Sequence, residues 1–216
     1  VNTPSASQLS QYMAKAGHRL TSLLTRAEIN TAISTLRAGS NRKAESSIRR
    51  MFGWDMLIPA EMKAGKTGRN FIWLSDNRPD RMRNICVYSY SGTTLDAHRA
   101  LAARDSVMRL NIPGELDGMY MQTTPGSVTA GLATEDGRTV MISRGLWEMR
   151  NDAMGGPFVS LSTVDSVNSR IIVAEAFVYA PGTNKRNLIR SAEAALYTLG
   201  RHAASGNNSK GSRQTD

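Results

Sequence analysis

The chain has 216 residues, 40% of them hydrophobic, which is enough to bury a core in one large domain or two small ones. Its longest apolar runs, such as residues 171–180, fall short of the roughly 20 residues that span a bilayer, so we expect no membrane-crossing helix. The single cysteine, Cys86, excludes an internal disulfide and a zinc site built from several cysteines, and we expect it to be buried.

The formal net charge of +9 is concentrated near the N-terminus. Residues 1–52 hold eight Lys or Arg and two acids, whereas residues 53–200 hold sixteen and fifteen. A nucleic-acid-binding domain is expected to gather basic and aromatic residues on a sheet, or basic residues along one docking helix. Here the basic residues are spread around predicted helices. This favours a solvated face, or attraction to an anionic membrane surface, over nucleic acid.

The first fifty residues predict helices. Apolar residues recur at spacings of three and four over residues 9–24, which lines one face of a helix. The sequence Thr25-Arg26-Ala27-Glu28 matches a capping box, so we expect a second helix to begin there and to end at Gly39. A third short helix over residues 44–52 is expected to end at Gly53.

From Trp54 the hydrophobic period becomes that of strands, with a loop predicted at 60–70. Strands are expected at 54–59, 71–75, 84–90, 119–124, 127–135, 138–149, 156–164 and 170–180. Asp136-Gly137 between two alternating runs is typical of a tight hairpin. Two amphipathic helices are expected, one beginning near Asp96 and one over 188–199.

The two halves of the body look alike, because residues 71–93 and 158–183 each read as strand, turn and strand before an amphipathic helix. An internal duplication and two unrelated ββα units both fit this order. Either way, the fold class is α+β: a mainly antiparallel sheet with helices packed on one face, and possibly two similar ββα-containing halves.

We expect three regions along the chain: a helical segment at 1–52 that packs on the body, an α+β body at 53–200 with possible halves 53–114 and 115–200, and a disordered tail at 201–216.

Motifs for known chemistries do not fit. The GKT at residues 65–67 lacks the leading glycine and the following helix of a phosphate-binding loop. The three histidines are scattered, and none forms a zinc motif. The sequence also lacks a nucleophile elbow and a set of residues that suggests a triad. We therefore expect no metal and no cofactor, and we assign no catalytic residue.

Charged residues on the predicted sheet give the candidate site. Arg144 and Glu148 share one strand face, and Trp147 lies on the other. Glu175 lies on an apolar strand face and must be paired or solvated. An Arg144–Glu175 or Arg144–Glu148 ion pair would only neutralise the sheet face. The alternative is a shallow polar pocket, with Trp147 or Tyr179 near its wall, that binds a peptide or glycan.

The candidate binding residues are Arg144, Trp147, Glu148, Asp152, Glu175 and Tyr179. The neighbouring Gly155-Gly156-Pro157 predicts a hairpin connection in which the glycines supply positive φ.

Seven segments together resemble a known family: AEIN at 27–30, MFGWDMLIPAEM at 51–62, NFIWLS at 70–75, ARDSVMRLNIPG at 103–114, RGLWEM at 144–149, MGGPFVS at 154–160 and AFVYAPGTNKR at 176–186. On these segments the chain resembles an uncharacterised bacterial family, domain of unknown function 4837, typically found as lipoproteins of Bacteroidota. Members usually carry a further N-terminal region after a lipid-attachment cysteine, so the chain resembles their later portion. The resemblance implies a location in the cell envelope, at the periplasm or outer membrane, and no established activity. Membrane association would then occur only through a lipid anchor outside this chain.

Three functional hypotheses follow. The first is a non-enzymatic, envelope-associated domain that binds or scaffolds an envelope protein, a peptide or a glycan. The second is a hydrolase or transferase that uses Glu148, Asp152 or Glu175 as general acid or base, which requires a cleft and a raised pKa. The third and weakest is a basic module for nucleic acid.

Overall fold

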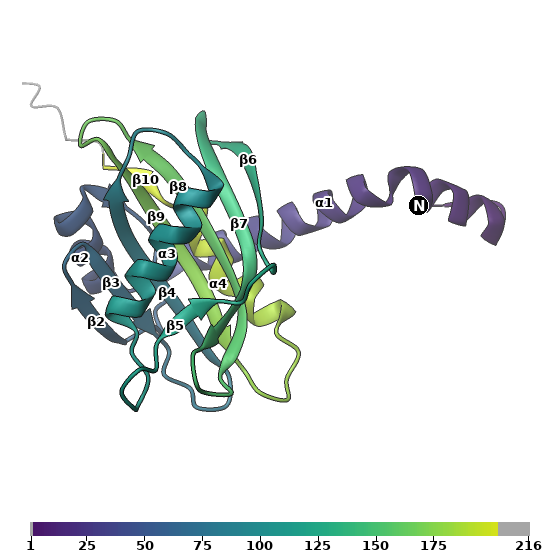
Figure 1. The fold of residues 1–216 in the computed structure, drawn as a ribbon. Helices are drawn as coiled ribbons and strands as arrows, with labels where there is room; N and C mark the ends of the chain where they lie inside the picture. Colours follow the sequence, from purple (N-terminus) through teal and green to yellow (C-terminus); the bar gives the residue numbers. More distant parts are fainter. Residues whose placement is uncertain (1, 203–216) are drawn as a thin grey trace, which may run out of the picture.

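The computed structural model describes residues 2–202 and is built around one eight-stranded antiparallel sheet (Figure 1). The strand order is β2-β3-β4-β9-β8-β7-β5, and β6 pairs with the first part of β7 while β5 pairs with its last part. A separate two-stranded ladder joins β1 to β10. None of the helices within residues 2–202 has the length and apolar composition that a membrane crossing requires.

The helices are α1 (Ala6–Ala38), α2 (Arg42–Phe52), α3 (Ala97–Asn111) and α4 (Arg186–Leu196). The strands are β1 (Trp54–Asp55), β2 (Ala64–Gly68), β3 (Phe71–Ser75), β4 (Met82–Ser91), β5 (Met121–Thr123), β6 (Thr129–Glu135), β7 (Arg138–Met149), β8 (Gly155–Asp165), β9 (Arg170–Tyr179) and β10 (Gly200–Arg201).

The α+β class with a mainly antiparallel sheet is confirmed, and its helices cover both faces of the sheet rather than one. In the central strand β9, Ala174 and Ala176 pack toward α2 and α4, whereas Val173 and Phe177 pack toward α3. Because β9 is apolar on both faces, each face needs a cover. The small alanines let α4 approach closely on its side.

The two ββα segments predicted from the sequence are β3-β4-α3 and β8-β9-α4. They form one continuous sheet, because β4 pairs with β9 over ten residue pairs. Their helices lie on opposite faces of that sheet. Because the strand order is β3-β4-β9-β8, the rotation that superposes the second strand pair on the first has its axis perpendicular to the sheet. Such a rotation leaves each face of the sheet on its own side. It therefore does not superpose α4 on α3, which lies on the other face. An origin by duplication and the predicted division into regions stay predictions. Of the tail predicted at 201–216, Arg201 pairs with Trp54 in the β1–β10 ladder and the backbone N–H of His202 donates to the Gly53 carbonyl, whereas residues from 203 onward lie outside the described residues.

Helix α1 runs without a break from its N-cap Ser5 to Gly39, so the predicted second helix start at Thr25 is wrong. A capping box acts only where the chain enters a helix from an extended conformation. The residues before Thr25 already continue the helix, and their carbonyl groups accept the hydrogen bonds that a cap would replace. The first half of α1 projects from the body, whereas its second half reaches α4 (Figure 1), where Glu28 pairs with Arg186 at 3.0 Å.

Two local predictions fail at the edge of the sheet. The loop expected at 60–70 contains strand β2, whose exposed glycines and lysine lack apolar alternation because it is an edge strand. The strand expected at 54–59 is ordered as strand only at β1, since the backbone N–H of Leu57 donates to the hydroxyl of Thr198 instead of to a neighbouring strand. Gly53 ends α2 in the left-handed conformation as predicted.

Candidate binding site

Arg144 and Glu175 lie on opposite faces of the sheet, so the predicted ion pair between them is wrong. Arg144 pairs in register with Val159, which pairs with Ala176, and directly paired residues share a face. Glu175 is one residue out of this row, and a shift of one residue reverses the face. The Arg144 guanidinium instead donates to Glu193 of α4.

Glu148 does not pair with Arg144 either. Its carboxylate accepts hydrogen bonds from the Gln122 amide at 2.8 Å and the Thr124 hydroxyl at 2.9 Å. Both donors come from the β5 region, which pairs with the last part of β7. The charge of Glu148 is therefore satisfied by neutral donors at the edge of the sheet.

Glu175 lies in a fully buried polar cluster between α3 and the sheet. Arg104 of α3 donates to both of its carboxylate oxygens, at 2.8 Å from Nη2 to Oε1 and 3.0 Å from Nε to Oε2. The Ser160 hydroxyl donates to the same carboxylate at 3.1 Å, and the Arg104 guanidinium lies 3.9 Å from the centre of the Phe158 ring. Burial raises the pKa of Glu175, although Arg104 and Ser160 act to lower it.

This cluster is closed to solutes. The cavity beside Arg104 and Ser160 has a volume of about 20 Å³, enough for roughly one water molecule. Since Glu175 is fully buried and its oxygens are occupied, it does not contact a substrate in this structure. The sequence carried one unused signal for the pair: Arg104 lies between Leu101 and Met108 on the apolar face of α3, where an unpaired charge would be costly.

Trp147 belongs to the core, with little of its side chain exposed. Its side chain is 2% exposed, and its ring meets Phe177 edge-on with centroids 5.5 Å apart. The indole N–H donates to the carbonyl of Val178 at 3.2 Å. Tyr179 packs half-buried against the same cluster. The Trp147 ring therefore presents no free face of the kind on which a sugar could stack.

Gly155 and Gly156 belong to the start of β8, and the turn before them takes its positive φ at Asn151. The predicted role of the glycines as suppliers of positive φ is therefore wrong. A Cβ on Gly156 would lie 2.0 Å from the Val178 carbonyl oxygen, so glycine is required for the close approach of β8 and β9.

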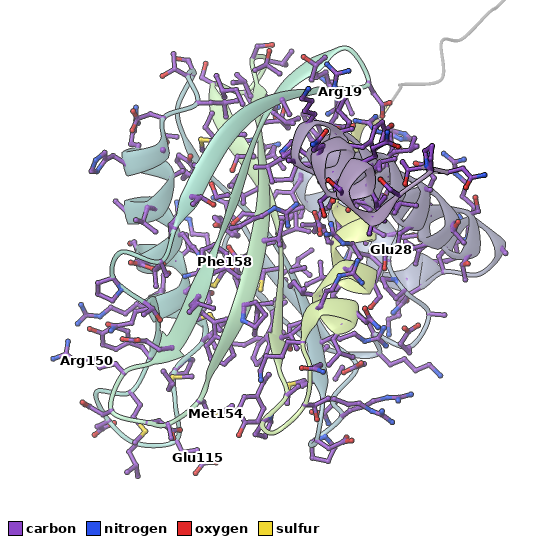
Figure 2. All side chains as sticks on the ribbon, turned by 90° about the vertical axis from the view of Figure 1, so that its right-hand side faces the viewer. Arg19, Glu28, Glu115, Arg150, Met154 and Phe158 are labelled. Carbon is purple, nitrogen blue, oxygen red and sulfur yellow. The ribbon has the colours of Figure 1, made fainter. Side chains whose placement is uncertain are left out.

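A cavity of about 670 Å³ lies around this turn, near the labelled Arg150 and Met154 in Figure 2. It gathers three of the predicted residues, Trp147, Glu148 and Asp152, and adds Lys185. Asp152 is exposed, and its carboxylate accepts the backbone N–H of Ala153 at 2.6 Å. The structure thus brings together half of the predicted set and leaves Arg144, Glu175 and Tyr179 outside the cavity.

A larger groove, of about 910 Å³, lies between the second half of α1, helix α2 and the β6–β7 hairpin; we call it the α1 groove. Its α1 wall consists of Ser22, Thr25, Arg26, Ile29, Asn30, Ile33, Ser34 and Arg37. Its floor and opposite wall consist of Met56, Leu57, Ala133, Glu135, Asp136, Ile142, Tyr197 and Thr198, and α2 closes one end with Arg42, Glu45 and Arg49 beside Asp55. These residues come from distant parts of the sequence, so local patterns gave no sign of the groove.

The charges at the closed end of the α1 groove are paired with one another. Arg49 donates to Asp55 at 2.5 Å, and the His202 ring nitrogen lies 2.7 Å from the same carboxylate. Although burial alone would raise the pKa of Asp55, the hydrogen bonds from His202 and Arg49 lower it. Within residues 2–202, Arg26 and Arg37 on the α1 wall form no ion pair.

The fold and the groove define an α+β protein with an eight-stranded antiparallel sheet, covered on both faces, and an open groove between a long helix and the sheet. The chain belongs to the family defined by the domain of unknown function DUF4837, which it matches over residues 41–198. The matched region begins at the N-cap of α2 and ends just after α4, so it includes the floor of the groove and leaves out α1. Among curated proteins, none matches the chain closely enough to count as a relative.

Proposed function

We propose that this chain is a non-enzymatic binding or scaffolding domain of the cell envelope, which holds a polypeptide segment of a partner protein in the α1 groove. The observation that carries the proposal is the groove itself. Its volume of about 910 Å³ lies within the range of roughly 300–1,000 Å³ that is typical of ligand sites.

The lining of the groove favours a polypeptide. Aliphatic side chains such as Ile33 and Ile142 alternate with hydroxyl and charged groups, and Tyr197 supplies aromatic surface at only one point. Strand β6, which lines the groove through Ala133 and Glu135, pairs with β7 and has its other edge free among the described strands. An extended peptide can hydrogen-bond to such an edge, and this mode of recognition is common.

The charges of the groove favour one orientation of the bound segment. Arg26 and Arg37 lie on the α1 wall, and Glu135 and Asp136 lie on the opposite wall. A segment with acidic residues toward α1 and basic residues toward β6 would complement both walls. Such complementarity selects the partner and fixes its register more than it adds affinity.

The geometry supports binding better than acid–base chemistry. Of the three carboxylates that the enzymatic alternative requires, Glu175 is buried against Arg104, and Glu148 accepts hydrogen bonds from neutral donors. Asp152 is exposed on a turn. A general acid or base needs a sheltered position within reach of a substrate and a free carboxylate oxygen. Glu148 is half-buried beside the cavity of about 670 Å³, but Gln122 and Thr124 each occupy one of its two carboxylate oxygens.

The envelope location and a lipid anchor outside this chain rest on the resemblance to lipoproteins and belong to the same proposal. Fractionation of cells that express the full-length protein tests them. We expect the protein in the membrane fraction, released by detergent but not by high salt. Recovery in the soluble cytoplasmic fraction would refute the envelope location, but it would not bear on the proposal that the α1 groove binds a polypeptide.

The groove is tested by photocrosslinking. A benzophenone amino acid placed at Asn30 or Arg37, both exposed on the α1 wall, should crosslink a partner protein in cells. The matched control is Lys43, which is exposed on α2 outside the groove. A synthetic peptide covering the crosslinked segment should bind the purified domain, and Ile33→Asp should weaken this binding at least about tenfold. Equal crosslinking at Lys43, or peptide binding that is insensitive to Ile33→Asp, would refute the groove as the site.

A further inference from the structure

The projecting first half of α1 carries a stripe of exposed apolar side chains. The exposed fractions are 40% for Leu9, 44% for Tyr12, 44% for Met13, 65% for Leu23 and 68% for Leu24. Figure 1 shows this half of the helix extending away from the sheet. A row of large apolar side chains on one side of a helix is a common mark of an interaction surface.

This stripe is not a continuation of the surface that packs on the body. At about 100° per residue, the stripe over residues 9–24 is rotated by roughly 160° from the buried positions Ile29 and Leu36. Figure 2 looks along the helix and shows Glu28 on the side facing α4, with Arg19 on the opposite side. The helix therefore offers a second face that the body of this chain does not cover.

The spacing of the stripe is that of a coiled-coil seam. Leu9, Met13, Ala16, Leu20, Leu23 and Ala27 follow one another at alternating steps of four and three residues. The seam is about 27 Å long at 1.5 Å per residue. Ala16 and the adjacent Gly17 are small, which lets another helix approach closely. The seam has two positions in every seven residues, which suits a partner helix, whereas a broader apolar face is typical of a membrane surface. Tyr12 and Leu24 lie at its two margins, where they can pack against the same partner.

The charges beside the seam select the partner. Arg19 and Arg26 occupy successive flanking positions on one side of the seam, and residues 2–27 contain no Asp or Glu. An antiparallel second copy would bring these arginines toward each other, and a parallel copy would place Arg19 opposite Leu24. A helix with glutamates along its flank would pair with both arginines.

We infer that the first half of α1 is a docking helix for an amphipathic partner helix with acidic flanks. This surface is distinct from the α1 groove, because none of its seam residues lines the groove, although the flanking Arg26 borders both. The inference therefore does not depend on the proposed function of the groove.

The test uses two synthetic heptad peptides of about three heptads, which share leucine at the seam and differ only in glutamate or lysine at the flanks. The full chain should bind the glutamate peptide at least about tenfold more tightly than the lysine peptide, measured by fluorescence anisotropy. The double variant Leu20→Gln/Leu23→Gln should weaken binding at least about tenfold. The control variant Ala14→Gln/Thr21→Gln, on the same helix but off the seam, should bind as the native chain does.

Three outcomes would overturn the inference. One is equal binding of the two peptides, or of the native chain and the seam variant. Another is a dimer of the chain in sedimentation that Leu20→Gln/Leu23→Gln dissolves, since the occupant would then be a second copy. The last is binding to phosphatidylglycerol vesicles that Leu20→Gln/Leu23→Gln weakens, together with no binding to the glutamate peptide. That result would assign the stripe to a lipid surface.

Discussion

Replacing Arg104 with methionine removes the cation that pairs with the buried carboxylate of Glu175. Arg104 is 2% exposed and donates to both carboxylate oxygens, and Glu175 is fully buried. Removing one partner of a buried ion pair typically costs about 3–5 kcal/mol, because the other charge stays desolvated. For a domain of this size, that is a fall of roughly 6–20 °C in the unfolding temperature.

The loss should depend on pH in a defined direction. Burial already raises the pKa of Glu175, and without Arg104 this pKa rises further. The folded variant then keeps a proton that the unfolded chain releases near the ordinary carboxyl pKa. The stabilisation from this bound proton is complete below the ordinary carboxyl pKa of the unfolded chain. It is lost as pH rises from there through the raised pKa of Glu175 in the folded variant, by up to about 1.4 kcal/mol per pH unit.

Urea unfolding followed by tryptophan fluorescence, at about pH 5 and about pH 8, measures both effects. The double variant Arg104→Met/Glu175→Gln should recover much of the loss at the higher pH and show less pH dependence. Arg109→Met, on the same helix at an exposed position, serves as control and should cost about 1 kcal/mol or less. A loss below about 1 kcal/mol for Arg104→Met, or a double variant no more stable than the single one, would refute the reasoning.

Three further predictions test the sheet and its polar contacts. Arg144→Leu should cost less than about 2 kcal/mol in chemical denaturation, because Glu193 keeps its other hydrogen bonds; a larger loss would contradict this. Gly156→Ala should lower the free energy of unfolding by at least about 2 kcal/mol, since its Cβ would lie 2.0 Å from the Val178 carbonyl oxygen. The control Gly131→Ala has open space around the added Cβ and should be nearly neutral. Equal melting temperatures of the two variants would disprove the close-approach argument. Burial and Glu193 raise the pKa of Tyr197 to about 12, so its contribution to stability is present below about pH 10 and lost toward pH 12. The ultraviolet difference titration between the native chain and Tyr197→Phe should show this shift, and a midpoint near 10 would count against it.

Much of the fold could be predicted from the sequence where local chemistry decides the structure. The strand predicted at 138–149 is β7 with the same bounds, because Asp136-Gly137 forms the turn before it with positive φ at both residues. Asp96 caps α3 by accepting the backbone N–H of Arg99, as its position in the sequence indicates. The predicted burial of Cys86 is confirmed, and it too follows from the local sequence, because Cys86 lies within the apolar run of strand β4.

The sequence by itself determined the class of the fold, the central strands and the ends of α2 and α3 at Gly53 and Asp96, because these depend on residues within a few positions of one another. The tertiary structure alone decided which elements meet. It placed Arg144 and Glu175 on opposite faces, since face is set by strand register across β7, β8 and β9. It paired Glu175 with Arg104, 71 residues away along the chain, and it formed the α1 groove from separate elements. Long-range contacts of this kind leave no local periodicity, so only the packed chain shows them.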